Sequence, residues 1–234
     1  MAELYLGHQK ITPILKGVDG FASRVGANAN GEFEYKTTDF VMPSSVKTIK
    51  GESMRYAFYG DKSIKTVNFN KVSAISGVNA CANTFQNCTS LEYVDMSSVK
   101  DIYGNNNAAN AMFSGCTNLK YVDLSSLERL SATTTFANGF LNCTSLESME
   151  FPSLWYLFGH LCLQNLFKGC TNLKEVRFPA LADMNKGTNQ FNSMLSGVTG
   201  CTVHFPAAMR EYISSLADAL AGFGGTDTVI LFDL

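Results

Sequence analysis

One short pattern recurs along the middle of the chain and constrains the fold more than any other feature. A Phe is followed three residues later by Cys-Thr, and the Cys is followed three residues later by Leu. The complete copies begin at Phe85, Phe113, Phe140 and Phe167, and incomplete copies begin at Phe58 and Leu195. Successive copies are 27 or 28 residues apart. Repeats with a fixed period in this range stack into one elongated solenoid, so we expect a single repetitive core.

Each copy keeps the same positions apolar, and this predicts how one repeat folds. In the third copy these positions are Phe113, Leu119, Val122, Leu124, Leu127 and Leu130. The residues alternate around Val122, so Tyr121 and Asp123 are expected on the opposite side of a short strand. Stacked repeats would place these strands about 4.8 Å apart in a parallel sheet. The segments before each Phe vary most, and we interpret them as a turn followed by about one helical turn that carries the Phe.

The consensus Phe-x-Gly/Asn-Cys-Thr-Asn/Ser-Leu-x-x-Val-x-Leu/Phe-Pro-x-Leu-x-x-Leu resembles the BspA-like class of leucine-rich repeats over roughly residues 38–206. This resemblance implies a β-rich α/β fold, a leucine-rich-repeat solenoid or horseshoe with a parallel sheet and about six repeats of 27–28 residues. The sequence departs from the usual unit by about four extra residues before the Phe. The family is common in surface and host-contact proteins of gut and oral bacteria. It is associated with adhesion and protein binding, and it implies no catalytic residues and no cofactor.

The repeats divide the chain into three parts, with boundaries predicted at 1–36, 37–206 and 207–234. The first part is predicted to form a hairpin from strands at 4–6 and 11–15, which either caps the solenoid or attaches it to something else. The last part is predicted to close the other end, with a helix over 207–220 after Pro206 and a strand over 228–232. The chain start and this ending are also similar to proteins encoded in prophage tail regions of gut bacteria.

Composition and charge limit the classes of partner. Charged residues make up 16% of the chain and the net charge is −2, so no basic patch is expected and a nucleic-acid partner is excluded. No apolar run is long enough for a membrane span, and the first residues lack the features of a secretion signal. We therefore expect either a protein that stays inside the cell or one that has lost an export signal. The repeat family favours the cell surface, and the prophage likeness favours a phage particle.

Four cysteines recur at the same position of each complete repeat. They are Cys88, Cys116, Cys143 and Cys170, and their spacing is unlike that of a zinc site. We interpret them as a column of buried, reduced thiols, with disulfides or a metal as less favoured alternatives. Cys81 and Cys162 lie outside the column, so they are better candidates for reactivity.

The sequence contains no recognisable catalytic constellation. The three histidines are far apart in the repeat scheme, and neither a Gly-x-Ser-x-Gly motif nor a phosphate-binding glycine loop is present. We therefore predict that the protein is not an enzyme and uses no cofactor or metal.

The outward-facing strand positions are the predicted binding site. In the middle of the sheet these positions are aromatic and acidic, and the candidate binding residues are Tyr93, Asp95, Tyr121, Asp123, Glu150, Glu175 and Arg177. Tyrosine offers a ring and a hydroxyl at low entropic cost, while stacked carboxylates favour a basic partner or cations. The alternatives are a merely solvated face and a second surface rich in asparagine, made by Asn79, Asn83, Asn105, Asn106, Asn107 and Asn110.

Two functions follow from this reading. The first is a protein-binding or adhesion-type module that presents its sheet face to a protein or glycan and is a monomer or weak oligomer. The second is a structural component of a prophage tail or surface assembly, in which the solenoid is mainly a spacer.

Overall fold

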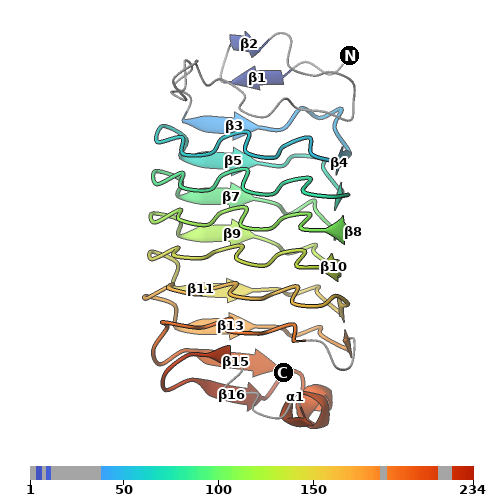
Figure 1. Ribbon diagram of the computed structural model, residues 1–234, viewed down its shortest axis with the longest axis vertical. Coiled ribbons are helices and arrows are strands. Elements are labelled where there is room, and N and C mark those ends of the chain that lie inside the picture. Colours follow the sequence, from blue (N-terminus) through green and yellow to red (C-terminus); the bar gives the residue numbers. More distant parts are fainter. Residues whose placement is uncertain (1–3, 7–8, 12–37, 185–188, 216–222) are drawn as a thin grey trace.

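The computed structural model describes residues 4–6, 9–11, 38–184, 189–215 and 223–234. It shows a parallel β-solenoid of about seven turns, in which each turn of chain passes through three walls (Figure 1). The predicted repeat solenoid with its parallel sheet is confirmed. The described part of the chain contains no helix long and apolar enough to cross a membrane.

The first wall consists of the strands predicted from the alternation around Val122. It divides into two four-stranded sheets. The strands of one are β3 (Asp39–Val41), β5 (Thr66–Asn68), β7 (Tyr93–Asp95) and β9 (Tyr121–Asp123); those of the other are β11 (Ser148–Glu150), β13 (Glu175–Arg177), β15 (Thr202–Phe205) and β16 (Val229–Phe232). The central residue of each strand from β3 to β13 is buried and its neighbours are more exposed, as expected for a sheet with one face on the core.

The second wall is one continuous parallel sheet of six short strands. They are β4 (Thr48–Lys50), β6 (Ala74–Ser76), β8 (Asp101–Asn106), β10 (Arg129–Thr133), β12 (Tyr156–Leu157) and β14 (Asp183–Met184). Its turns approach one another closely at Gly77, directly after β6, and Gly104, within β8. A Cβ at Gly104 would lie 2.4 Å from the Gly77 amide nitrogen, so this corner requires glycine.

The third wall, which carries the repeat Phe, contradicts the predicted helical turn. Its described residues form successive turns instead of a helix. Alternate amides bond to the next turn of the solenoid, as when Asn83 donates to the Asn110 carbonyl at 2.9 Å. Every fourth residue has a positive φ, for example 55° at Asn79, 57° at Asn83 and 63° at Asn87. A left-handed residue at this interval prevents helix formation, and Asn adopts that conformation more readily than most residues.

The core is a continuous apolar column between the three walls, and stacked rings run along it. Phe58, Phe85, Phe113, Phe140 and Phe167 are almost fully buried, and successive rings are nearly parallel with centroids 5.1 to 5.7 Å apart. A second stack of Phe151, Phe178 and Phe205 begins lower in the solenoid. Offset stacks of this kind add to the apolar area that each ring buries.

The predicted cysteine column is buried and its thiols are free. Each Sγ donates to the carbonyl of the Phe one turn earlier, at 3.0 to 3.2 Å, and these carbonyls belong to Phe58, Phe85, Phe113 and Phe140. The column therefore joins neighbouring turns through the side chain as well as through the main chain. Cys81 and Cys162 are equally buried, which argues against the reactivity predicted for them.

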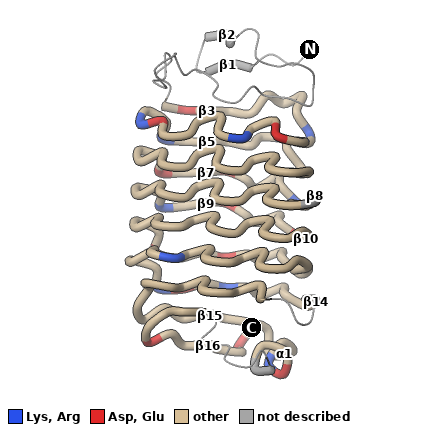
Figure 2. The backbone as a smooth tube through the Cα atoms, in the orientation of Figure 1, with Lys and Arg blue, Asp and Glu red and all other residues tan. Residues whose placement is uncertain are grey.

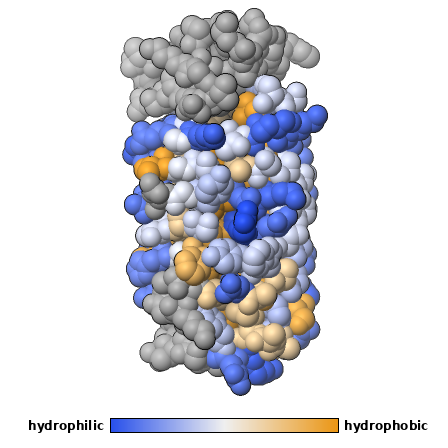
Figure 3. All heavy atoms as spheres, turned by 90° about the vertical axis from the view of Figure 1, so that its right-hand side faces the viewer, coloured by the Kyte–Doolittle hydropathy of each residue, from blue (hydrophilic) through white to orange (hydrophobic). Residues whose placement is uncertain are grey.

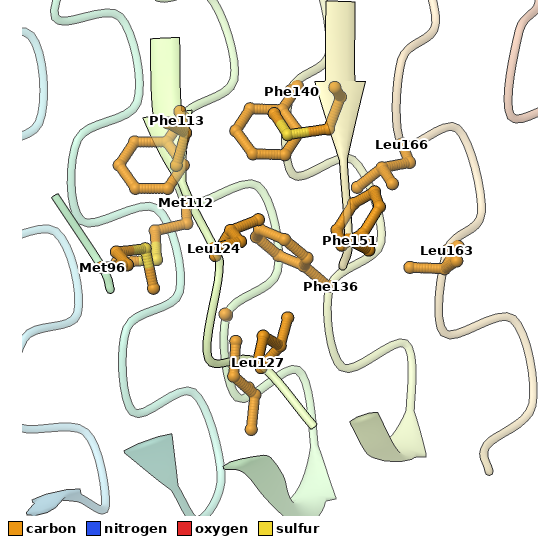
Figure 4. Close-up of a cluster of buried hydrophobic side chains, with 14 of the residues drawn as sticks. Met96, Met112, Phe113, Leu124, Leu127, Phe136, Phe140, Phe151, Leu163 and Leu166 are labelled. Atoms are coloured by element: carbon orange, nitrogen blue, oxygen red, sulfur yellow. The ribbon is translucent and has the colours of Figure 1, made fainter. Parts of the chain in front are cut away.

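The first wall is interrupted between β9 and β11, where Figure 1 shows a wider space between the arrows. Among the described strands, β9 pairs only with β7, and β11 pairs only with β13. The core changes at the same level: the position of Ala109 in one turn is occupied by Phe136 in the next, and that of Met112 by Gly139. Phe136 lies between Leu124 and Phe151 (Figure 4), so we infer that its ring holds the two strands apart.

The two ends of the solenoid carry different elements. At the start, β1 (Leu4–Leu6) and β2 (Gln9–Ile11) pair antiparallel, and residues 12–15 of the predicted second strand lie outside the described part. At the other end Pro206 precedes a 3-10 turn, η1 (Ala207–Met209), and a short helix, α1 (Arg210–Ser215). Residues 216–220 of the predicted helix also lie outside the described part of the chain. The final strand, β16, pairs parallel with β15.

Candidate functional site

The predicted binding residues all lie on the first wall, and their register follows the repeat. Tyr93 pairs with Tyr121 and Asp95 with Asp123, while Glu150 pairs with Arg177 across β11 and β13. The break separates these residues into an upper group on β7 and β9 and a lower group on β11 and β13. Figure 2 shows acidic and basic positions scattered along a mostly uncharged chain, in keeping with its low charge.

The upper group contains a stacked and exposed pair of tyrosines. The Tyr93 and Tyr121 ring centroids are 5.4 Å apart and the ring planes differ by 14°. The two residues keep 40% and 52% of their surface exposed. Partial burial, followed by the charges of Asp95 and Asp123, raises the pKa of both phenols. The pair therefore presents rigid, protonated tyrosines in a negative environment near neutral pH.

Asp95 and Asp123 occupy equivalent positions but differ in their hydrogen bonds. The Asp95 carboxylate accepts hydrogen bonds from the Asn68 amide at 3.0 Å and from the Ser97 hydroxyl at 2.6 Å. Asp123 also accepts a bond from a following main-chain amide, that of Ser125, at 2.9 Å. Among the described residues, no side chain donates a hydrogen bond to Asp123. Its second carboxylate oxygen is therefore more available to a ligand than that of Asp95.

The lower group is a chain of charged and hydrogen-bonding side chains. Arg177 lies 2.9 Å from Glu175 and 3.9 Å from Glu150. His204 Nε2 is 3.1 Å from the same Glu175, and its Nδ1 is 2.9 Å from Asp233, just after β16. The single guanidinium of Arg177 therefore compensates two carboxylates, and Glu175 is shared with His204. Asp233 was not singled out by the sequence because it lies outside the repeat frame.

A hollow of about 300 Å³ lies at the break. Its lining includes five of the predicted binding residues and six of their neighbours; the five are Tyr121, Asp123, Glu150, Glu175 and Arg177. Val122, Leu124 and Met149 form a nearly buried apolar part of this lining. The alternation along the strands predicted that the binding candidates share one face of the sheet. It did not predict the hollow, because nothing in that alternation signals an interrupted sheet.

The asparagine-rich surface has a different role from the one considered for it. Asn79, Asn83 and Asn107 are among the positive-φ residues of the third wall. Their side chains also bond within the solenoid, for example from Asn79 to Glu52 and from Asn83 to Gln86. These residues are explained by backbone geometry, which weakens the case for a binding surface there.

An exposed aromatic group on the second wall was not anticipated. Trp155 and Phe158 are exposed beside β12, and the ring of the partly buried Tyr156 stacks on that of Phe158 at 5.5 Å. Figure 3, which faces this wall, shows apolar atoms gathered in its lower half. The described residues contain no group of three or more His, Cys, Asp or Glu side chains arranged to hold a metal ion.

The repeat architecture agrees with the comparison with known families. The model described as a BspA type leucine rich repeat region (6 copies) matches residues 29–166 and 134–199, which is well over half of the chain. The chain belongs to the BspA-type leucine-rich repeat family. Families with this repeat are typically non-catalytic. The residues that match the family include all seven candidate binding residues of this BspA-type chain.

Solved structures include a similar protein. A leucine-rich repeat protein of T. pallidum (TpLRR), known from a crystal structure, aligns over 87% of this chain and 95% of its own, with 15% sequence identity and a TM-score of 0.38. The comparison with curated proteins finds no match.

Proposed function

We propose that this BspA-type repeat chain is a non-enzymatic binding module that presents its first wall to a protein partner with basic side chains. The observation that carries the proposal is the stacked pair Tyr93 and Tyr121, half-exposed beside Asp95 and Asp123. Rigid aromatic residues at the middle of a surface are the usual anchors of protein interfaces. The carboxylates beside them favour a partner of opposite charge.

A glycan is the second class of partner that fits this face. Its hydroxyl groups would bond to the carboxylates, and its apolar faces would pack on the rings. The tyrosines, however, stack on each other, and this stacking covers one ring face of each. The acidic surroundings favour a charged partner, so we rank a basic protein above a neutral glycan.

The test is to replace both tyrosines and measure capture of partners from bacterial and host surface extracts, together with a protein and glycan array. The variant Tyr93→Ala, Tyr121→Ala should lose at least about tenfold in affinity, because each ring is a candidate hot spot. The matched control is Tyr103→Ala, since Tyr103 is also about half exposed, at 43%, but lies on the second wall.

Both variants should keep the circular dichroism spectrum and melting temperature close to those of the parent chain, because exposed side chains contribute little to stability. Equal partner capture by the parent and the double variant would contradict the proposal. That result would favour the other predicted role, a spacer in a surface or prophage tail assembly, which needs no binding face.

A further inference from the structure

The break in the first wall leaves main-chain groups unpaired. In five other turns an amide of this wall donates to a carbonyl of the next turn at 2.8 to 3.0 Å; the donors are Met42, Phe69, Met96, Phe151 and Phe178. Leu124 is the corresponding residue at the break, and within the described chain its amide makes no such bond. Facing edges of β9 and β11 therefore offer free carbonyl and amide groups.

These edges border the hollow of about 300 Å³, whose shape and polarity suit a particular side chain. Its nearly buried part is apolar, through Val122 and Met149. Its polar lining carries three carboxylates, on Asp123, Glu150 and Glu175, and one cation. An apolar stem with a positively charged end would satisfy both parts.

We propose that the break binds the arginine side chain of a partner protein, with its guanidinium between Asp123 and Glu150. A guanidinium has five N–H donors and no acceptor, so it can bond to carboxylates and free carbonyls together. It is planar, which suits a slot between two strands, and it stacks on an aromatic face such as that of Tyr121. A lysine ammonium has three donors and lacks this planar shape.

The inference rests on the proposed function, because it names the chemistry by which the first wall would recognise its partner. The two share Tyr121, but the carboxylates that would hold the guanidinium, Asp123 and Glu150, are unchanged in the tyrosine variant. The tyrosine test measures capture of a whole partner, whereas occupancy of the break can be measured with a small probe. Failure of one test therefore leaves the other result standing.

The experiment is an NMR titration of the ¹⁵N-labelled chain with N-acetyl-arginine amide, N-acetyl-citrulline amide and N-acetyl-lysine amide. Citrulline has nearly the shape of arginine without the charge. The arginine compound should shift the amides of Leu124 and Glu150 with a Kd on the order of 1 mM, as expected for so small a ligand. The lysine compound should bind more weakly, and the citrulline compound should cause no saturable shift.

Glu150→Gln should weaken binding of the arginine compound about tenfold. The control Asp183→Asn, which removes a carboxylate from β14 on the second wall, should leave it unchanged. Shifts centred away from the break, equal binding of citrulline or lysine, or a Glu150→Gln variant that binds as well as the parent would each overturn the proposal.

Discussion

The Cys116 thiol donates to the Phe85 carbonyl, and the other members of its column make the same contact. Burial, the largest cause, raises the pKa of Cys116 and Cys143 well above its usual range. It also raises the pKa of Cys170 to about 12. A neutral thiol is thus part of the folded core, and this ties stability to pH.

Alkaline pH should destabilise the fold through these thiols. The pKa of each thiol is higher in the folded state than the value of about 9 in the unfolded chain. The thiol's contribution to stability is therefore complete below pH 9 and is lost as the pH rises toward the folded-state pKa. Each such thiol should lower the free energy of unfolding by about 1.4 kcal/mol per pH unit in this window. Urea unfolding followed by circular dichroism at pH 7, 9, 10 and 11 would measure the loss.

Cys170→Val provides the control, because Val198 already occupies the next position of the same column. This variant should fold. Above pH 9 its free energy of unfolding should fall less steeply than that of the parent chain, by about 1.4 kcal/mol per pH unit, because one ionising thiol is absent. A slope identical to that of the parent chain would show that Cys170 ionises as readily when folded as when unfolded.

At this scale the sequence predicted the face of most strand residues, because apolar and polar positions alternate around Val122. It did not predict the left-handed backbone of the third wall. Asn79, Asn83 and Asn87 offered a hint in their spacing of four, but the equivalent positions elsewhere carry residues such as Thr134 and Leu161, which seldom adopt a positive φ. The pattern was therefore obscured, and a helical turn was predicted instead.

At the scale of the elements, the strands of the repeat were predictable but their pairing was not. Pairing depends on the volume of side chains that stack across turns, and those side chains are 27 or 28 residues apart in sequence. The change from Ala109 and Met112 to Phe136 and Gly139 keeps a large residue beside a small one, yet it moves the bulk to a different position. The seven binding candidates were placed on one face, while the hollow among them depends on this change.

Transplanting the core pair of the next turn should close the break. In that turn Leu163 and Leu166 occupy the positions of Phe136 and Gly139, and the adjoining strands β11 and β13 are paired. In the variant Phe136→Leu, Gly139→Leu, β9 and β11 should pair. The Leu124 amide should then exchange with deuterium at least about tenfold more slowly than in the parent, as NMR would detect.

Gly139→Leu alone is the matched control. A Cβ at this position would lie 2.9 Å from the Phe136 ring, so the single variant should lose about 1 to 3 kcal/mol of stability and keep the break. If the Leu124 amide of the parent chain exchanged with deuterium as slowly as the Met96 amide, that result would contradict the interrupted sheet itself.

At the scale of the whole molecule, a solenoid is stabilised by contacts between neighbouring turns, so its ends are exposed unless other elements cover them. At the C-terminal end, Phe223 is buried and stacks on Phe191 at 5.1 Å, and Phe232 lies against Phe205 at 6.2 Å. β16 covers the open edge of β15. From these contacts we expect the segment after Pro206 to cap the stack, and the division of the chain at 1–36, 37–206 and 207–234 stays a prediction.

Asp233→Asn separates the hydrogen bond with His204 from the capping role. This substitution leaves β16 and both aromatic contacts in place, so the variant should have the same mass in solution as the parent chain. Its melting temperature should fall by only a few degrees, because one hydrogen bond to a half-exposed carboxylate contributes about 1 kcal/mol to stability.

Removal of residues 207–234 should instead make the solenoid self-associate. The truncation exposes the rings of Phe191 and Phe205 and frees the main-chain groups of β15, and an uncovered strand beside exposed aromatic rings is a template for pairing with another chain. Size-exclusion chromatography with light scattering should show oligomers or aggregates for the truncated chain under conditions in which the Asp233→Asn variant matches the parent. A truncated chain with the mass of one copy and an unchanged melting temperature would show that the stack needs no cover at this end.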